Sequence, residues 1–338
     1  QMYSLKSDVM YIVAVSMDQL VTRVAILDMQ NNFAFPIENF ELTLANNPKS
    51  LNQLLDLLKK YIQKSGIVKN KIVGIGIGMP GFVDIKKSIN NTYLKPARGN
   101  VVSELESELG VPVFIDNDSS LVALAELKFG KARNRKNSMV INIGWGVGLG
   151  MILNGELFRG NNGFAGEFSH IPIFTNNKIC GCGKSGCLET ETSLLVIIDK
   201  AIKGIKEGKS TSLKDISMDH PEAAAHSIIE AALHGDSFSI DLITEVGYNI
   251  GRGVAVLIHI LNPELIVLSG RGSLAGRLWR APIQQAINKL CIPKIAEDTT
   301  IEISQMNYQA EIIGTACLVM DQIDKRKFLL THEKSLIS

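Results

Sequence analysis

Residues 163–189 read GFAGEFSHIPIFTNNKICGCGKSGCLE, and the rest of the chain is organised around this stretch. Cys180, Cys182 and Cys187 form a C-x-C-x4-C pattern with glycines between them, and His170 precedes the first cysteine. Three thiolates and one imidazole are a complete tetrahedral ligand set for a structural zinc ion, with no position left for a catalytic water. We therefore predict a closed zinc site formed by these four residues.

Two other readings of the cysteines stay open. One is a disulfide, although Cys180 and Cys182 are too close in sequence to pair comfortably and three cysteines leave one over. The other is a loop of unliganded thiols. Zinc is favoured because ligand type, ligand number and glycine content agree. The glutamates of the stretch, Glu167 and Glu189, then have no metal to bind, and a fixed imidazole beside two carboxylates suits a ligand rich in hydroxyl groups.

Length and composition exclude several classes of protein. The chain has 338 residues, which is long for one core and comfortable for two domains. Its formal net charge of +1 gives no broad basic face for nucleic acid. No apolar run is long enough to cross a membrane and no signal peptide opens the chain, so we expect a cytoplasmic protein without a membrane partner. Cys291 and Cys317 lie in apolar surroundings, as buried thiols of a reducing compartment do.

The first half of the chain predicts three strands, a helix and a further buried strand. The strands are β-branched and apolar runs separated by turn residues, and the helix carries leucines on one face with Pro48 in its first turn. These elements cover residues 9–15, 20–27, 33–42, 48–62 and 71–78, and Met79-Pro80-Gly81 breaks the last strand.

The same order returns in the second half, with strands expected at residues 139–143, 147–153 and 265–268. Two helices are also expected, the first beginning at Asp219 and Pro221 and ending at Gly235, the second running from Ile240 to Asn262-Pro263 with Gly247, Gly251 and Gly253 allowing a close neighbour. The repetition indicates a duplicated α/β fold of two lobes with a central cleft. Glycine-rich hairpin turns facing that cleft can present backbone N–H groups to phosphates.

With these motifs the sequence resembles the ROK family of sugar kinases and sugar-responsive repressors, which share an actin-like (ribonuclease H-like) fold. The resemblance extends from about Val9 to Cys317. It rests on GIGIGMPGFVD at 74–84, VFIDND at 113–118, NGELFRGNNGFAGEFSH at 154–170, CGCGKSGCLE at 180–189 and LNPELIVLSG at 261–270. The fold it implies has a linker remnant at 1–8, an N-terminal lobe at 9–117 plus about 305–338, and a C-terminal lobe at 118–304 that contains the zinc loop.

The resemblance also implies roles for individual residues. The zinc ligands would be His170, Cys180, Cys182 and Cys187, and the sugar contacts would be Asn117, Asp118, Glu167, His170 and Glu189. In the family's kinases the residue matching Asp118 is the general base that takes the proton from the attacking sugar hydroxyl. Asp118 can also be read as the N-cap of a helix over residues 119–129.

The expected nucleotide turns depart from the pattern of the kinases. The first turn, residues 16–19, has no glycine, and Val15 or Ser16 stands where the kinases have a metal-handling Asp. The second turn keeps its glycines but has Trp145 in place of a hydroxyl residue, and the third, at residues 269–272, is also altered. Two smaller departures, Ser120 and Ser169, fall among the sugar contacts and leave the sugar's identity open. A retained sugar set beside altered phosphate turns is typical of the family's repressors, which sense a sugar without phosphorylating it.

Two functions remain as hypotheses, beside a third in which the chain is a structural relic that uses neither sugar nor nucleotide. The first is a sugar-sensing effector domain of a transcriptional repressor, dimeric or tetrameric, that binds a sugar or sugar phosphate next to a structural Zn²⁺. Such repressors contact DNA through an N-terminal helix-turn-helix, which residues 1–338 do not contain, and their C-termini extend as residues 321–338 do here. The alternative is an ATP-dependent sugar kinase that uses Asp118 as general base and ATP with Mg²⁺.

Overall fold

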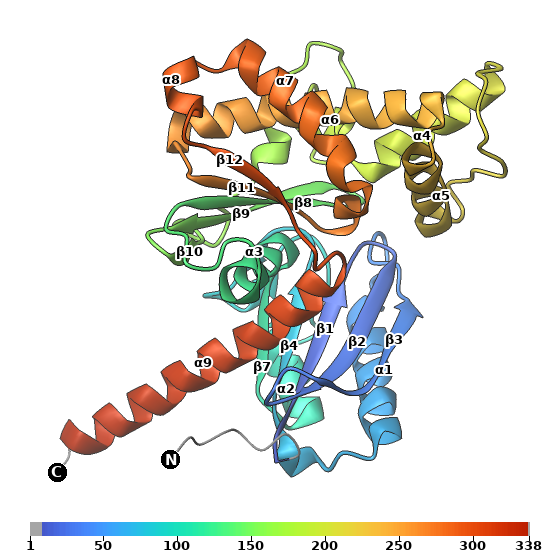
Figure 1. The fold of residues 1–338 in the computed structure, drawn as a ribbon. Helices are drawn as coiled ribbons and strands as arrows, with labels where there is room; N and C mark the ends of the chain where they lie inside the picture. The colour runs from blue at the N-terminus through green and yellow to red at the C-terminus, as the bar shows by residue number, and fades with distance from the viewer. Residues whose placement is uncertain (1–8, 337–338) are drawn as a thin grey trace. The chain divides into compact units, whose positions relative to one another are not determined.

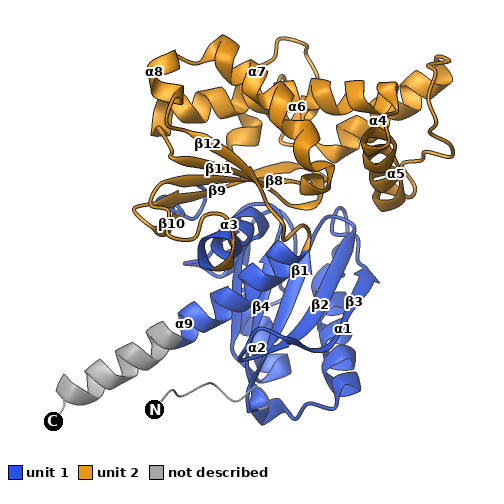
Figure 2. Ribbon diagram, viewed as in Figure 1, with its two compact units in different colours: residues 1–128, 159–165, 309–338 blue, residues 129–158, 166–308 orange. Residues whose placement is uncertain are grey.

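The structure is a computed structural model that describes the backbone of residues 9–336 and the side chains of residues 9–323. The expected linker remnant at 1–8 and most side chains of the tail lie outside the described residues. The chain forms two compact units (Figure 2). Unit 1 comprises residues 1–128, 159–165 and 309–338, and unit 2 comprises residues 129–158 and 166–308.

Unit 1 is built on a five-stranded sheet in the order β3-β2-β1-β4-β7 (Figure 1). β1 (Tyr11–Met17) and β2 (Val21–Asp28) form an antiparallel hairpin, which β3 (Phe33–Glu41) extends. β4 (Ile72–Met79) and β7 (Val113–Asn117) continue the sheet in the direction parallel to β1. β1, β2 and β4 are buried along nearly their whole length, and their sequences are mostly apolar without regular alternation, although β2 also buries Thr22 and Arg23. A short hairpin of β5 (Val83–Asp84) and β6 (Ile89–Asn90) follows β4.

Helix α1 (Ser50–Ser65) packs on the unit 1 sheet through the leucine face that the sequence predicts. Its Tyr61 is 1% exposed and donates a hydrogen bond of 2.7 Å to the carbonyl oxygen of Pro36 in β3. The helix begins at Ser50, so Pro48 precedes it and the prediction of a proline in its first turn was wrong. The reason is a turn before the helix, in which the carbonyl oxygen of Asn47 accepts the N–H of Ser50 at 3.2 Å.

Helices α3 (Asp118–Phe129) and α9 (Gln309–Leu336) pack closely in unit 1, where α2 (Val101–Leu109) also contacts β7. A side chain at Gly314 of α9 would collide with the backbone of Leu121 in α3. This packing places α3 in unit 1, so the division between the units falls after residue 128, whereas the sequence suggested residue 117. The second division between the units falls before residue 309, whereas the sequence suggested about residue 305. Residues 159–165 belong to unit 1, whereas the sequence suggested that they belong to the C-terminal lobe.

Unit 2 repeats the strand plan of unit 1, in the order β10-β9-β8-β11-β12 (Figure 1). β8 (Ser138–Ile143) and β9 (Val147–Leu153) form the hairpin, and β10 (Glu156–Phe158) extends it antiparallel. β11 (Leu265–Ser269) and β12 (Thr300–Ile303) run parallel to β8. The predicted duplicated α/β, actin-like fold is confirmed. Within this sheet, β10 and β12 had no counterpart among the predicted strands, because both are short and not fully buried.

The helices of unit 2 follow the predicted order with shifted starts. α5 (Pro221–Leu233) begins after His220, where the sequence suggested Asp219. α6 (Ser237–Leu261) starts before the predicted Ile240, because Asp236 caps it, and ends at Asn262 in a left-handed conformation. The remaining helices are α4 (Leu194–Lys206), α7 (Arg280–Leu290) and the single turn α8 (Pro293–Ala296).

The glycines of α6 allow the close packing that the sequence predicts. A Cβ at Gly251 would lie 2.6 Å from the Cβ of Ala286 in α7, and one at Gly247 would lie 2.7 Å from Cγ of Pro282. Within the described residues, no helix is both long and apolar enough to cross a membrane.

We predict that Asp236→Ala destabilises the protein by about 1–2 kcal/mol, the usual cost of losing a helix N-cap. The carboxylate of Asp236 accepts the N–H of Ser239 at 2.8 Å and that of Ser212 at 2.6 Å. Desolvation alone would raise the pKa of Asp236, but these N–H groups outweigh it and hold the pKa below its usual range. Thermal and urea unfolding of both proteins at several pH values measures the difference.

Because the folded pKa is lowered, the stabilisation is fully present above the unfolded pKa of about 3.9 and is lost as the pH falls below it. The difference between wild type and Asp236→Ala should therefore be constant from pH 5 to 8 and shrink in more acidic solution. Asp199→Ala is the control, because Asp199 makes only an exposed pair with Lys203 and its loss should cost nothing measurable. Equal stability of the Asp236 variant and wild type at pH 7 would contradict the capping role.

Candidate metal centre and ligand-binding residues

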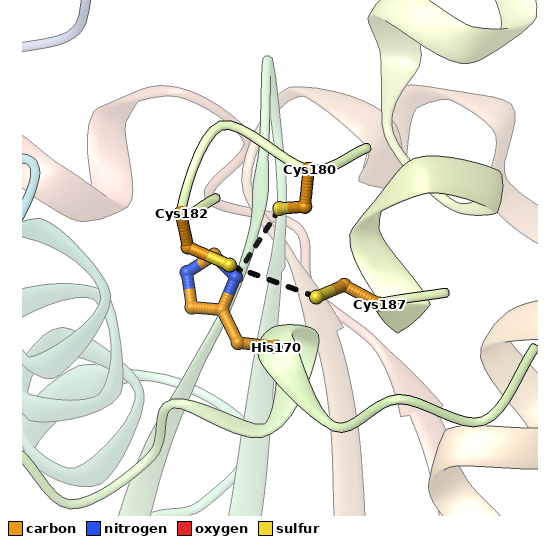
Figure 3. Close-up of side chains that lie close together, drawn as sticks. All are labelled: His170, Cys180, Cys182 and Cys187. Carbon is orange, nitrogen blue, oxygen red and sulfur yellow. Dashed lines mark hydrogen bonds between the residues drawn. The ribbon is translucent and has the colours of Figure 1, made fainter. Parts of the chain in front are cut away.

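The side chains of His170, Cys180, Cys182 and Cys187 converge in unit 2 (Figure 3). Their ligand atoms all lie within 4.8 Å of one another. Nδ1 of His170 is 3.5 Å from Sγ of Cys180, and Sγ of Cys182 is 3.7 Å from Sγ of Cys187. Tetrahedral zinc with bonds of about 2.3 Å to sulfur and about 2.0 Å to nitrogen spaces its ligands about 3.5–3.8 Å apart. The four side chains thus have a spacing that a zinc ion can use.

The disulfide reading of the loop does not agree with this geometry. All three cysteines are free. The 3.7 Å between the sulfur atoms of Cys182 and Cys187 is far from the S–S bond length of about 2.05 Å. The cluster is therefore a set of thiols around an imidazole, as a metal site requires.

The cysteine loop is a tight hairpin that depends on one glycine in particular. The N–H of Cys180 donates to the carbonyl oxygen of Lys184 at 2.8 Å, and the N–H of Gly183 donates back to that of Cys180 at 2.9 Å. Gly186 has a φ of +74°, and a side chain there would collide with the carbonyl oxygen of Phe174. By contrast Gly181 has an ordinary φ and open space around it, so the loop does not need a glycine at that position.

The carboxylate of Glu191 anchors the cysteine loop through ion pairs and a hydrogen bond. It is only 6% exposed, and its carboxylate lies 2.5 Å from Nζ of Lys178 and 3.3 Å from Nζ of Lys200 in α4. The side-chain amide of Asn176 donates to the same carboxylate at 2.6 Å. Burial alone would raise the pKa of Glu191, but the two lysines outweigh it and lower the pKa. The sequence analysis missed this residue, because its partners are separated from it along the chain and only folding brings them together.

Helix α6 supports both ends of the metal-binding segment. The short helix Phe168–His170 carries the histidine ligand at its end. The short helix Leu188–Glu191 directly follows Cys187. A Cβ at Gly253 of α6 would lie 2.5 Å from Leu188 and 3.1 Å from the ring of Phe168. Gly253 therefore lets the chain on either side of the cysteines rest directly on α6.

Glu167, His170 and Glu189, three of the predicted sugar contacts, lie together beside this cluster in unit 2. Nε2 of His170 is 3.6 Å from Oε2 of Glu167, while its Nδ1 faces Cys180. Glu189 lies 3.8 Å from the Cys180 sulfur and accepts the N–H of Val147 at 3.3 Å. Partial desolvation raises the pKa of Glu167, the His170 imidazole opposes the rise, and the charge of Glu189 adds to it. The imidazole thus has one nitrogen toward the thiols and one toward a carboxylate, as metal-bound histidines usually do.

The other two predicted contacts, Asn117 and Asp118, are in unit 1 at the junction of β7 and α3. The side-chain oxygen of Asn117 accepts the N–H groups of Ser119 at 3.0 Å and Ser120 at 3.2 Å, so Asn117 caps the helix. The prediction of Asp118 as the N-cap was wrong by one position, since Asp118 is already the first helical residue. Its carboxylate accepts the N–H of Ser119 at 2.7 Å and lies at the positive end of the helix.

The β1–β2 turn, the first of the expected nucleotide turns, is filled by its own carboxylate. Oδ1 of Asp18 accepts the N–H groups of Leu20 at 2.7 Å and Val21 at 2.8 Å. Its second oxygen forms an ion pair of 3.1 Å with Arg23, and Asp18 is 6% exposed. The adjacent Ser16 is also buried, and its hydroxyl donates to Glu311 of α9. Two N–H groups at the end of the turn, those of Leu20 and Val21, therefore already bind a carboxylate of the chain itself.

The β8–β9 turn of unit 2 is occupied by a large side chain. Trp145 is 6% exposed, and the guanidinium of Arg271 lies 5.0 Å from the centre of its ring. Arg271 is itself buried, with Nε 3.3 Å from a carboxylate oxygen of Glu222 in α5. Trp145 and Arg271, the altered residues of the second and third turns, thus pack on each other.

The ROK family profile matches residues 37–322, and the chain belongs to the ROK family. It is 33% identical over 276 residues to a glucokinase of Halalkalibacterium halodurans, covering 80% of this chain and 82% of that one. It is 32% identical over 282 residues to a xylose repressor of Caldicellulosiruptor bescii, covering 81% and 69%. A ROK family transcriptional regulator of known crystal structure, a homolog of the E. coli MLC protein, has a TM-score of 0.79 at 26% identity, over 93% of this chain and 78% of that one. Kinases and repressors are thus both relatives.

We predict that Gly186→Ala disrupts the cysteine loop and that Gly181→Ala leaves it intact. An alanine at Gly186 needs a left-handed backbone, which costs about 1–2 kcal/mol before its collision with Phe174 is counted. The two substitutions are chemically identical and lie in the same loop. Limited proteolysis and thermal unfolding distinguish them, and equal behaviour of the two variants would show that the backbone at Gly186 is not strained.

Proposed function

We propose that this chain is the sugar-sensing effector domain of a ROK-type transcriptional repressor. A sugar or sugar phosphate would be bound by Asn117 and Asp118 of unit 1 and by Glu167, His170 and Glu189 of unit 2. The observation that carries the proposal is the β1–β2 turn, in which the Asp18 carboxylate holds the backbone N–H groups of Leu20 and Val21.

Phosphoryl transfer depends on positioning and on neutralising phosphate charge, so a kinase needs its phosphate turns open. A triphosphate at the β1–β2 turn would have to displace Asp18 from two N–H groups and from Arg23. It would also approach Glu311, whose carboxylate accepts the Ser16 hydroxyl, and meet the repulsion between like charges. Both effects oppose ATP binding and favour a sensor.

The second turn supports the same conclusion. The buried indole of Trp145 occupies the turn, and Arg271 packs on its ring while paired with Glu222. A phosphate there would require the buried indole to leave, and with it the contact of the ring with Arg271, whose partner Glu222 is more than half exposed.

The sugar contacts keep the chemistry that hydroxyl groups need. Carboxylates accept hydrogen bonds from hydroxyls, and the amide of Asn117 can donate and accept. Binding would act as a signal by shifting the population between conformations of different affinity for the sugar. In a homodimer or tetramer this shift would reach DNA through a helix-turn-helix, which the described residues 9–336 do not include. The proposal places the protein in the cytoplasm, in line with cysteines that are all free.

We further propose that the His170–cysteine cluster binds a structural Zn²⁺, as its donor atoms and their spacing suggest. Zinc there would fix Nδ1 of His170 and leave Nε2 directed at Glu167. We predict one zinc per chain in the purified protein, and its loss in Cys182→Ser. Cys291→Ser is the control, because Cys291 is a free cysteine outside the cluster and its variant should keep the metal. Elemental analysis measures both, and a full zinc content in Cys182→Ser would rule out this ligand set.

We predict that the protein binds at least one sugar without consuming ATP. Calorimetry with glucose, xylose, N-acetylglucosamine and their phosphates should give saturable binding, weakened about tenfold or more in Glu189→Gln by loss of a charge-assisted hydrogen bond. A coupled assay of ADP release with the same sugars should show no turnover above the background without protein.

Two results would contradict this proposal. If none of the sugars binds, the chain is not a sensor for this class of ligand. If a sugar is phosphorylated and Asp118→Asn abolishes the turnover, the alternative of an ATP- and Mg²⁺-dependent sugar kinase with Asp118 as general base replaces it.

A further inference from the structure

Residues 159–165, here called the crossing loop, belong to unit 1 although the chain on either side belongs to unit 2 (Figure 2). The N–H of Ala165 donates to the carbonyl oxygen of Arg159 at 3.1 Å, which closes the loop at its base. A backbone hydrogen bond therefore holds the two ends of the loop together.

The crossing loop is fixed in unit 1 mainly by an ion pair. Nε and Nη2 of Arg159 donate to Oδ2 of Asp116 at 3.0 and 2.7 Å, and Asp116 is 1% exposed. Weaker contacts hold the rest of the loop. Nζ of Lys86 donates to the carbonyl oxygen of Asn161 at 2.9 Å, and the ring of Phe164 meets that of Phe82 edge-on at 5.8 Å.

Asp116 links Arg159 to the proposed sugar contacts of unit 1. Its other oxygen accepts the N–H of Asn117 at 2.8 Å, and the Asn117 amide donates to the carbonyl oxygen of Gly81 at 3.3 Å. Burial raises the pKa of the Asp116 carboxyl, and Arg159 opposes the rise by favouring the ionised form. Arg159 thus places two N–H donors and a positive charge on the carboxyl group directly before Asn117 and Asp118.

The other end of the crossing loop leads directly to the contacts of unit 2. Gly166 has a φ of +102°, and a side chain there would collide with the carbonyl oxygen of Leu149 in β9. Glu167 follows immediately, and His170 ends the same short segment. Only Gly166, fixed against β9, separates the closed loop from the first sugar contact of unit 2.

We propose that Arg159 is a positioning residue that couples the two sets of sugar contacts. Through Asp116 it orients Asn117 and Asp118, and through the closed base of the crossing loop it restrains Glu167. This inference rests on the proposed function for the identity of the ligand. A sugar that engages Asn117 and Asp118 therefore also slows the opening of the crossing loop and of residues 166–170.

Arginine is better suited to this role than lysine. Two N–H groups of one planar guanidinium donate to a single oxygen of Asp116, which fixes the angle as well as the distance. Lysine at this position keeps the charge but cannot hold two N–H donors in a fixed planar arrangement. Arg159→Lys should therefore preserve the stability of the protein more fully than it preserves the coupling between the two sets of sugar contacts.

The experiment uses the double variant Asp116→Asn/Arg159→Met, because Arg159→Met alone would leave a buried carboxylate without its cation. Arg159→Lys is the conservative variant. Arg135→Met is the control, since it also removes an arginine from an ion pair, but its pair with Glu264 is longer, at 3.3 Å, and nearly half-exposed. Circular dichroism establishes folding. Calorimetry then gives the affinity for each sugar that wild type binds, and hydrogen exchange is followed in peptides 113–121 and 159–170 with and without that sugar.

In wild type and Arg135→Met, the sugar should slow exchange in both peptides. The double variant should bind at least about tenfold more weakly, equivalent to one lost hydrogen bond, and the sugar should no longer protect peptide 159–170. The sugar affinity of Arg159→Lys, and the protection that the sugar gives its peptide 159–170, should lie between those of wild type and the double variant. A double variant that binds and is protected like wild type overturns the coupling while the sensor function stands.

If wild type binds no sugar, the proposed function fails. Hydrogen exchange of the variants without sugar then tests separately whether Arg159 positions its neighbours. Faster exchange of both peptides in the double variant than in Arg135→Met supports positioning by Arg159. Unchanged exchange in peptide 113–121 overturns it.

Discussion

The ligand face of unit 2 depends on bringing three sulfur atoms and one imidazole nitrogen within 4.8 Å of one another. Several features far apart in the chain serve this constraint. Gly186 allows the hairpin, Glu191 binds Lys178 beneath it, and Gly253 lets α6 lie against both flanks. His170 belongs to the cluster and to the proposed sugar contacts, so whatever holds the sulfur atoms also sets the imidazole toward Glu167.

Both hairpin turns are filled by side chains of the chain itself. A backbone turn that favours an anion does not distinguish a phosphate from a carboxylate at the same place. Asp18 supplies that carboxylate in unit 1, with Arg23 completing its neutralisation. In unit 2 the turn is filled by an indole and a paired guanidinium. The strand plan of the fold is kept in both units, while different side chains fill its two turns.

The crossing loop adds a second kind of connection. Its ion pair is formed with a nearly fully buried carboxylate, which makes it far less replaceable than the exposed pairs elsewhere on the surface. Because Asp116 also binds the backbone of Asn117, the geometry of one proposed sugar contact depends on an arginine that lies distant in sequence. The proposed coupling would let the proposed sugar contacts of the separate units respond together.

The sequence by itself determined the duplicated strand plan, the leucine face of α1, the glycine contacts of α6 and the four candidate metal ligands. These follow from local patterns, namely apolar runs, helical spacing and ligand types within one short segment. Only the tertiary structure decided that Asn117 caps α3, that Asp18 fills its own turn, that Glu191 anchors the cysteine loop and that Arg159 pairs with Asp116. A charged or amide side chain has many possible partners along a chain, and only the packing of distant elements selects which one it meets.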